Sequence, residues 1–214
     1  MYLPKPFAET DLEARHGLIR ARPLATVVTL SSEGINANHI PLLLREMPEP
    51  YGKLQGHVPR ANPLTHDLIR GTESLAVFHG PDGYITPSWY ATKKQHGKVV
   101  PTWNYSVVHA YGHLEIIDDP EWVRLQVEAL TNENESRFSD PWKVSDAPRS
   151  YTDRMIRGLV GIEIVITRLL GKTKASQNQP DANRAGVIEG LKNLGDDNSD
   201  ALAELTGSQD ENAG

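Results

Sequence analysis

Side chains alternate most regularly in the stretch 100–113, which reads VPTWNYSVVHAYGH. Five rings occupy alternate positions of this stretch: Trp103, Tyr105, His109, Tyr111 and His113. Because side chains two residues apart point to the same face of a β-strand, one face carries rings and the other carries compact side chains. A wall of rings is typical of a β-core and also suits stacking on a flat heteroaromatic ligand. The pattern predicts a long strand over 102–117.

Apolar and β-branched runs elsewhere predict further strands, and capping signals predict helices between them. The predicted strands cover 24–30, 35–44, 53–58, 74–79, 84–89 and 160–169. The predicted helices cover 10–21, 62–70, 119–131, 151–157 and 180–194. Gly80-Pro-Asp-Gly83 predicts a turn between two of the strands. Strands dominate, which favours a mainly β (α+β) fold, an antiparallel barrel with peripheral helices.

Composition narrows the class of protein. The 214 residues contain no cysteine, which excludes disulfides, thiolate catalysis and Cys-ligated metal sites. We find neither a signal peptide nor an apolar run that could span a bilayer, and therefore expect a soluble cytoplasmic protein. The segment 195–214 has six acids and no Lys or Arg, and we expect an acidic, disordered tail. Residues 1–194 then hold 22 bases and 28 − 6 = 22 acids, which gives no global attraction to nucleic acid.

Two polar segments are candidates for binding a ligand. In the first, 36–41, the amides of Asn36 and Asn38 and the imidazole of His39 interrupt an apolar strand just before Pro41. This pattern predicts either a ligand-facing edge or a solvated edge. The second joins a strand end to a predicted helix start and contains His57, Arg60 and Asn62. Free N–H groups at a helix start and a planar guanidinium suit a phosphate, although a helix cap with one surface arginine has the same pattern.

Other polar groups give weaker signals. Lys93, Lys94, His96 and Lys98 make 90–99 the best basic patch for a contact with DNA, although a solvated loop has the same pattern. The eight histidines show no metalloprotease spacing, and no nucleophile elbow surrounds a serine. We therefore expect no metal site and assign no catalytic residue.

Several segments, in order along the chain, together resemble the PaiB family. These segments are MYLPKPF at 1–7, LQGHVPRANP at 54–63, YITPSWY at 84–90, VPTWNYSVVHAYG at 100–112, KASQN at 174–178 and GVIEGL at 186–191. The resemblance covers residues 1 to about 194. It implies a six-stranded antiparallel split β-barrel of the FMN-binding type that forms a homodimer, with flavin at the subunit interface.

The resemblance also implies a function and a set of site residues. It implies an FMN-binding negative regulator of transcription; the alternative is a flavin-dependent oxidoreductase, similar to pyridoxamine-phosphate oxidases, of unknown substrate. DNA is a partner in the first hypothesis, although the sequence has no recognisable DNA-binding motif. Arg60 is implied as the phosphate ligand, with His57 beside it. The full set of implied cofactor-binding residues is Asn38, His39, His57, Arg60, Asn62, Ser88, Trp89, Trp103 and Asn104.

Overall fold

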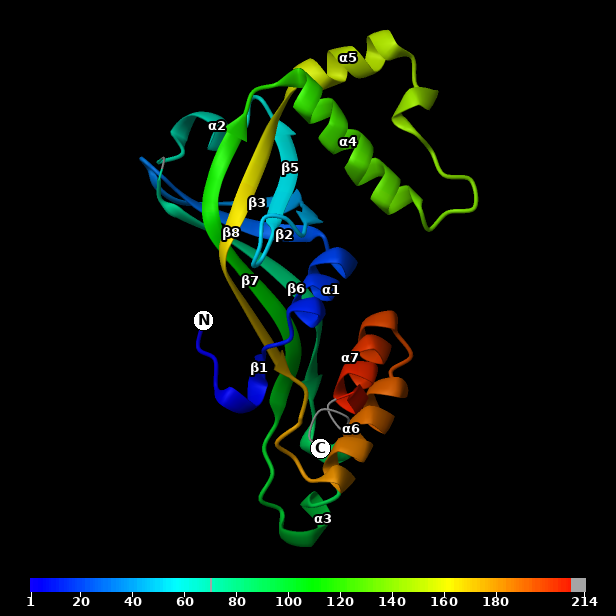
Figure 1. Cartoon of the computed structure of the whole chain (residues 1–214). Helices are drawn as coiled ribbons and strands as arrows, with labels where there is room; N and C mark the ends of the chain where they lie inside the picture. Colours follow the sequence, from blue (N-terminus) through cyan, green and yellow to red (C-terminus); the bar gives the residue numbers. More distant parts are fainter. Residues whose placement is uncertain (70, 209–214) are drawn as a thin grey trace. The chain divides into compact units, whose positions relative to one another are not determined.

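A computed structural model describes residues 1–69 and 71–208 of the chain (Figure 1). The strands are β1 (Ala8–Glu9), β2 (Leu24–Ser31), β3 (Gly34–Pro41), β4 (Leu43–Arg45), β5 (Lys53–Pro59), β6 (Glu73–Ile85), β7 (Thr102–Ile117) and β8 (Leu159–Lys174). The α-helices are α1 (Leu12–Ala21), α2 (Leu64–Asp67), α3 (Lys93–His96), α4 (Pro120–Glu135), α5 (Arg149–Arg157), α6 (Asp181–Lys192) and α7 (Asp197–Ser208). Short 3-10 helices are η1 (Lys5–Phe7), η2 (Pro87–Trp89) and η3 (Val144–Asp146). None of the helices in these ranges has the length and apolar character needed to cross a membrane.

The strands form one eight-stranded sheet in the order β3-β2-β6-β7-β8-β5-β4, with β1 paired to β8. β2 pairs antiparallel with β3 along its whole length, and β5 pairs antiparallel with β8 from Lys53 opposite Val165 to Pro59 opposite Leu159. The predicted mainly β, antiparallel fold is therefore confirmed. The predicted six strands are eight, and within the described residues the strand order is an open path from β3 to β4.

The chain divides into two compact units, each built from separate stretches of sequence. The first, here called the tip unit, comprises Met1–Leu18, His79–Val108 and Leu170–Gly214. The second, here called the sheet unit, comprises Ile19–Phe78 and His109–Leu169. The sequence predicted one domain over 1–194; in the structure, the residues from 170 onward belong with the N-terminal segment and with 79–108.

The sheet unit has a core of apolar side chains, most of them from alternate strand positions. Its buried members include Ala25, Val27, Ile40, Leu42, Leu54, Val58, Phe78, Ile162 and Ile164. α4 covers the outer side of β5 and β8, where the Trp122 ring packs on Gly161: a Cβ at Gly161 would lie 2.3 Å from the ring. α4 begins at the Asp119 cap that the sequence predicted, and it ends four residues later than predicted, at Glu135 rather than Thr131.

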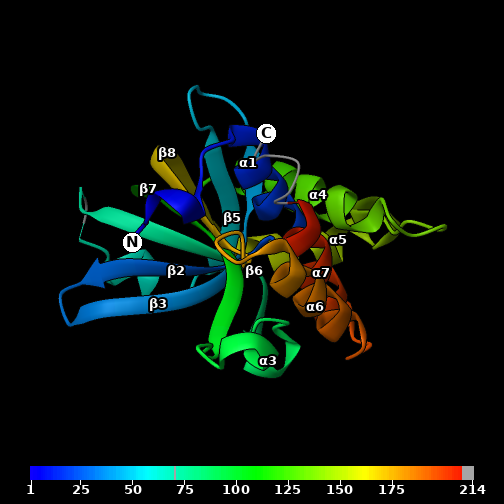
Figure 2. The same ribbon diagram turned by 90° about the horizontal axis from the view of Figure 1, so that it is seen from below.

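The tip unit contains a second apolar cluster, formed by the end of β6 with α6 and α7 (Figure 2). Its buried members are Ile85, Tyr90, Val187, Leu191, Leu202 and Ala203. The prediction of a disordered tail is wrong for residues 197–208, which form α7. Asp196 caps this helix by accepting hydrogen bonds from the Ser199 N–H and hydroxyl, at 3.0 and 2.7 Å. These bonds hold the pKa of the Asp196 carboxyl below its ordinary value. The rest of the predicted tail, 209–214, lies outside the described residues.

Two local predictions near the middle of the chain are wrong. β6 continues through Gly80 and Gly83, where a turn was predicted, and neither glycine has a positive φ. A Cβ at Gly80 would lie 3.0 Å from the Leu18 and Ser106 side chains, and one at Gly83 would lie 3.0 Å from Leu202. These glycines therefore allow close packing rather than a reversal of the chain. The strand predicted over 84–89 ends at Ile85 and is followed by η2.

Candidate functional site

The turn that follows β5 is held by backbone and hydroxyl hydrogen bonds. The Arg60 N–H donates to the Gly158 carbonyl and the Asn62 N–H donates to the Pro59 carbonyl, both at 2.8 Å. The Thr65 hydroxyl lies 3.1 Å from the Arg60 carbonyl oxygen and 2.9 Å from that of Asn62. The helix predicted over 62–70 is only α2, Leu64–Asp67, so a helix dipole contributes little here. These hydrogen bonds hold the backbone of the turn, and therefore fix the point from which the Arg60 side chain extends.

The Arg60 guanidinium is paired with a carboxylate. Its two terminal nitrogens donate to the two oxygens of Asp118, at 2.7 and 2.6 Å. Nε and one terminal nitrogen also donate to the carbonyls of Arg157 and Leu159, both at 3.3 Å. The Arg60 and Asp118 side chains are 44% and 61% exposed, so an anion from solvent has access to the pair. Sequence reasoning missed Asp118, which lies 58 positions from Arg60 in the chain.

The pair predicts a pH effect on Asp118. Hydrogen bonds from Arg60 hold the pKa of the Asp118 carboxyl below its ordinary value of 3.8. Because folding lowers this pKa, the pair stabilises the protein above pH 3.8 and loses that effect as the pH falls through the folded-state pKa. We expect NMR titration to show a depressed Asp118 pKa that rises in Arg60→Gln. The same pKa in both proteins would contradict the pairing.

A chain of three side-chain amides runs from the turn to the edge strand β3. Asn62 Nδ2 donates to Asn38 Oδ1 at 2.8 Å, and Asn38 Nδ2 donates to Asn36 Oδ1 at 2.9 Å. Asn62 Oδ1 accepts from the Leu64 N–H at 2.9 Å, which fixes the orientation of its amide. All three asparagines are half-buried. Asn36 belongs to the candidate segment 36–41 but was not among the implied cofactor-binding residues; its spacing of two from Asn38 places both on the same face of the strand.

The two histidines predicted for this site point elsewhere. His39 is exposed and, by strand alternation, lies on the face of β3 opposite Asn38. His57 faces α4, where its Nδ1 lies 2.7 Å from Gln126 Oε1. Gln126 is buried and donates through Nε2 to the Gln55 carbonyl at 3.4 Å, so its Oε1 accepts and His57 Nδ1 carries the proton. The sheet unit therefore brings together Arg60, Asn62 and Asn38, and it places both histidines away from the amide chain.

The predicted residues Ser88 and Trp89 belong to the tip unit and have packing roles there. The Ser88 hydroxyl accepts from Lys93 Nζ at 3.1 Å. The Trp89 ring lies against α6 at Gly190, where an added Cβ would be 2.3 Å from the ring. A Cβ at Gly186, one turn earlier, would be 2.0 Å from the Trp89 carbonyl oxygen. The two glycines thus form a groove that holds this tryptophan.

Trp103 and Asn104 point to opposite faces of β7. Trp103 is 55% exposed and makes an edge contact with Tyr84, with ring centroids 6.2 Å apart. Asn104 is fully buried; its Nδ2 donates to the Ser176 hydroxyl at 2.9 Å, and its Oδ1 has no hydrogen-bond partner within residues 1–69 and 71–208. The compact face of β7 is therefore the buried one. The rings that suggested a core lie on the more exposed face.

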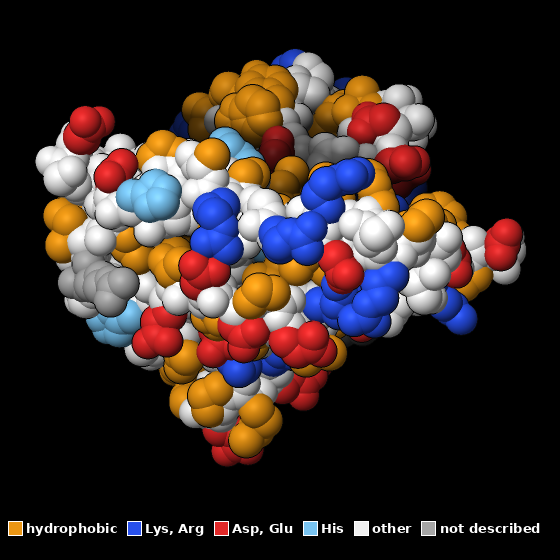
Figure 3. Space-filling model, turned by 90° about the horizontal axis from the view of Figure 1, so that it is seen from above, with side chains coloured by type: hydrophobic (Ala, Val, Ile, Leu, Met, Phe, Trp, Pro, Cys, Tyr) orange, Lys and Arg blue, Asp and Glu red, His pale blue; other side chains and the backbone are white. Residues whose placement is uncertain are grey.

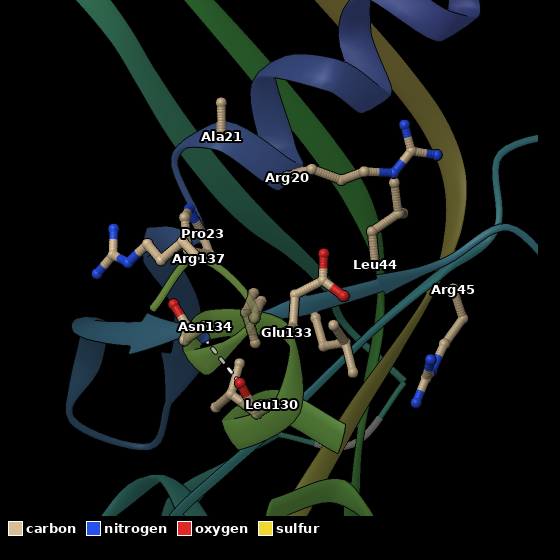
Figure 4. A pocket seen from close by; sticks show the side chains of 11 residues that line it. Arg20, Ala21, Pro23, Leu44, Arg45, Leu130, Glu133, Asn134 and Arg137 are labelled. Carbon is tan, nitrogen blue, oxygen red and sulfur yellow. Dashed lines mark hydrogen bonds between the residues drawn. The ribbon is translucent and has the colours of Figure 1, made fainter. Parts of the chain in front are cut away.

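A cavity of about 250 Å³ opens elsewhere in the sheet unit, between the end of α1, β4 and the end of α4 (Figure 4). Leu42, Leu43 and Leu44 are among its apolar lining residues, and Figure 4 shows the Glu133 carboxylate near Leu44. None of the residues predicted to bind a cofactor lines this cavity. It therefore adds nothing to the site at the turn.

Comparisons with known proteins agree with this architecture. A family model described as a putative FMN-binding domain matches residues 1–168. An uncharacterised protein of Emericella nidulans is 36% identical over 96% of both chains, and the protease synthase and sporulation protein PAI 2 of Bacillus subtilis is 29% identical over 96% of both. The solved flavocytochrome Anf3 of Azotobacter vinelandii has a similar fold, with a TM-score of 0.55 and 16% identity over 78% of this chain and 69% of that one. The chain therefore belongs to the family of FMN-binding domains that includes the PaiB protein of Bacillus.

Proposed function

We propose that this protein binds FMN and acts, as a dimer, as a PaiB-type negative regulator of transcription. The observation that carries the flavin proposal is the amide chain Asn62–Asn38–Asn36 beside the Arg60 turn. Asparagine amides both donate and accept hydrogen bonds, which matches the imide edge of a flavin ring. A guanidinium on a fixed turn matches its phosphate.

The donor set fits FMN on one condition, which concerns Arg60. Four of the five guanidinium N–H groups already have partners, two of them on Asp118. A phosphate that uses the paired face of Arg60 must take the place of the Asp118 carboxylate. Both side chains are substantially exposed, so this exchange buries no unpaired charge.

The regulator proposal is supported by the similarity to PAI 2, whose name links that protein to protease synthesis and sporulation. In the view of Figure 3, basic side chains lie among acidic ones instead of forming a surface of one charge. Several basic side chains of the described residues form ion pairs, as in Arg60–Asp118 and Arg124–Asp153. The exposed lysines of 90–99 are therefore the best candidates for a DNA contact, and a partner protein that contacts DNA is the other route to repression.

Titration of the purified protein with FMN tests the proposal. We expect quenching of flavin fluorescence at one FMN per chain and, by light scattering, a particle of twice 23.7 kDa. A colourless protein that neither binds FMN nor quenches its fluorescence would contradict the flavin proposal. For the FMN-loaded protein, we expect selective DNA binding that weakens with salt. Catalytic reduction of the flavin by NAD(P)H without DNA binding would instead favour a flavin-dependent oxidoreductase.

A further inference from the structure

Aromatic rings and two lysines share one exposed face of the tip unit. The set, here called the ring–lysine face, consists of Tyr2, Tyr84, Trp103, Tyr105, Lys172 and Lys174. Tyr2, Tyr84 and Trp103 are 83%, 50% and 55% exposed. Three exposed rings gathered on one face form an apolar patch that is available for contact with a ligand.

The two lysines of this face form no ion pair with a carboxylate in the described residues. Lys172 is only 9% exposed, and its Nζ lies 5.2 Å from the Tyr105 ring centroid and 5.8 Å from that of Tyr2. It donates to the Tyr2 carbonyl at 3.3 Å, and Lys174 donates to the Thr102 hydroxyl. Neither lysine forms an ion pair with an Asp or Glu in the described ranges, whereas buried lysines are ordinarily paired. The face therefore attracts an anion.

A cavity of about 310 Å³ adjoins the rings. It is lined by His79, Gly80, Asp82, Trp103, Tyr105 and Ser106. This volume is at the small end of the range for ligand pockets and suits one planar ring system. Asp82 lines the cavity and is exposed. A carboxylate here repels a phosphate but can accept a hydrogen bond from an amino group. The ring of a ligand is therefore expected in the cavity, with its negative charge directed toward the lysines.

We propose that the ring–lysine face binds a nucleotide with an amino-substituted base. The base stacks on Trp103 with its amino group toward Asp82, and the phosphate extends toward Lys172 and Lys174. Trp103 and Tyr105 are two strand positions apart, about 7 Å, and Lys172 lies beside Tyr105. An anionic group attached directly to the ring does not cover that span, whereas a phosphate on a sugar arm does. This inference goes beyond the proposed FMN site at the Arg60 turn.

Isothermal titration of the full-length, FMN-saturated protein with AMP tests this inference. We expect one AMP per chain, at least tenfold weaker binding of adenosine and of IMP, and no binding of benzoate. Trp103→Leu and Lys172→Met should each weaken AMP binding at least tenfold, and Lys172→Met should leave FMN binding unchanged. Trp142→Leu and Lys98→Met remove an exposed ring and an exposed lysine elsewhere, and should leave AMP binding unchanged. Circular dichroism should give the native spectrum for each variant.

Three results would overturn the inference. AMP that produces no heat at millimolar concentration would show that the face binds no nucleotide. Equal affinities for AMP and adenosine would show that the lysines recognise no anion. Competition between AMP and FMN would show that both ligands share one site; the inference would then fail while the FMN proposal holds. If the protein binds AMP but not FMN, the proposed function is wrong and the inference about the ring–lysine face is supported.

Discussion

The variant Gly190→Leu is expected to unfold with a free energy about 3 kcal/mol lower than that of the native protein, the upper range for overpacked sites. Gly190 is buried on α6, and a Cβ there would lie 2.3 Å from two ring atoms of Trp89. The ring has little room to move, because Gly186 lies against the Trp89 backbone one helical turn away. A leucine therefore separates α6 from η2 and opens the apolar cluster around Val187 and Leu191.

Urea unfolding followed by circular dichroism measures this effect. The matched control is Gly17→Ala in α1, where an added Cβ meets no atom within 4 Å. The free energy of unfolding of that control should rise by about 0.5–1 kcal/mol, because alanine loses less conformational entropy than glycine when the chain folds. The double variant Gly190→Leu/Trp89→Ala should recover part of the loss, because the clashing partner is removed. Native stability of Gly190→Leu alone would show that Trp89 does not occupy the groove.

The groove also explains why a packing motif was predicted to bind a cofactor. Trp89 and the segment GVIEGL at 186–191 both belong to the family resemblance, and Trp89 was also associated with the flavin site. In the structure they are partners across almost 100 residues of sequence. A resemblance identifies residues that a family shares, and it does not separate those that bind a ligand from those that hold the fold.

Strand periodicity was a reliable guide where one face of a strand is buried. β7 covers 102–117 as predicted, because compact and aromatic side chains alternate along it. The same alternation did not identify which face is buried, since Tyr and Trp suit both a core and a surface. Burial of Asn104 and Ser106 depends on the hydroxyls of Ser176 and Thr173, and no local pattern reveals these partners.

Composition was a poor guide at the C-terminus. Six acids without a base predicted disorder, whereas α7 buries Leu202, Ala203 and Thr206. The local signals for a helix were present: Asp196 precedes Ser199 at cap spacing, and acidic side chains fill the first turn. The acidic side chains are compatible with a capped helix whose apolar side is buried. Net charge alone therefore does not predict disorder here.

The candidate site was predictable in its turn and in its edge strand, but not in their connection. Asn38 and Asn62 were each selected from local sequence, and their hydrogen bond joins positions 24 apart. The Arg60–Asp118 pair joins positions 58 apart. Pairs of this kind depend on which strands become neighbours in the sheet. Local sequence patterns therefore do not predict them.

The second large effect that we expect is a change in FMN affinity when the ion pair between Arg60 and Asp118 is altered. Arg60→Ala is expected to weaken FMN binding by about 1–3 kcal/mol, the usual cost of losing a charged hydrogen bond. Asp118→Asn is expected to strengthen it, because the phosphate then no longer displaces a carboxylate from the guanidinium. Arg157→Gln removes a neighbouring exposed charge without disturbing the pair, whose contact with residue 157 is through the backbone carbonyl.

Fluorescence titration at two salt concentrations separates these effects, because a purely long-range contribution of charge is screened by salt. Arg157→Gln should change FMN affinity only at low salt, whereas Arg60→Ala should weaken binding at both concentrations. Unchanged affinity in Arg60→Ala would place the phosphate elsewhere. Weaker binding in Asp118→Asn would mean that the carboxylate orients Arg60 toward the phosphate instead of competing with it. The sign of the Asp118→Asn effect therefore decides whether the ion pair seen in the structure is broken or kept when FMN binds.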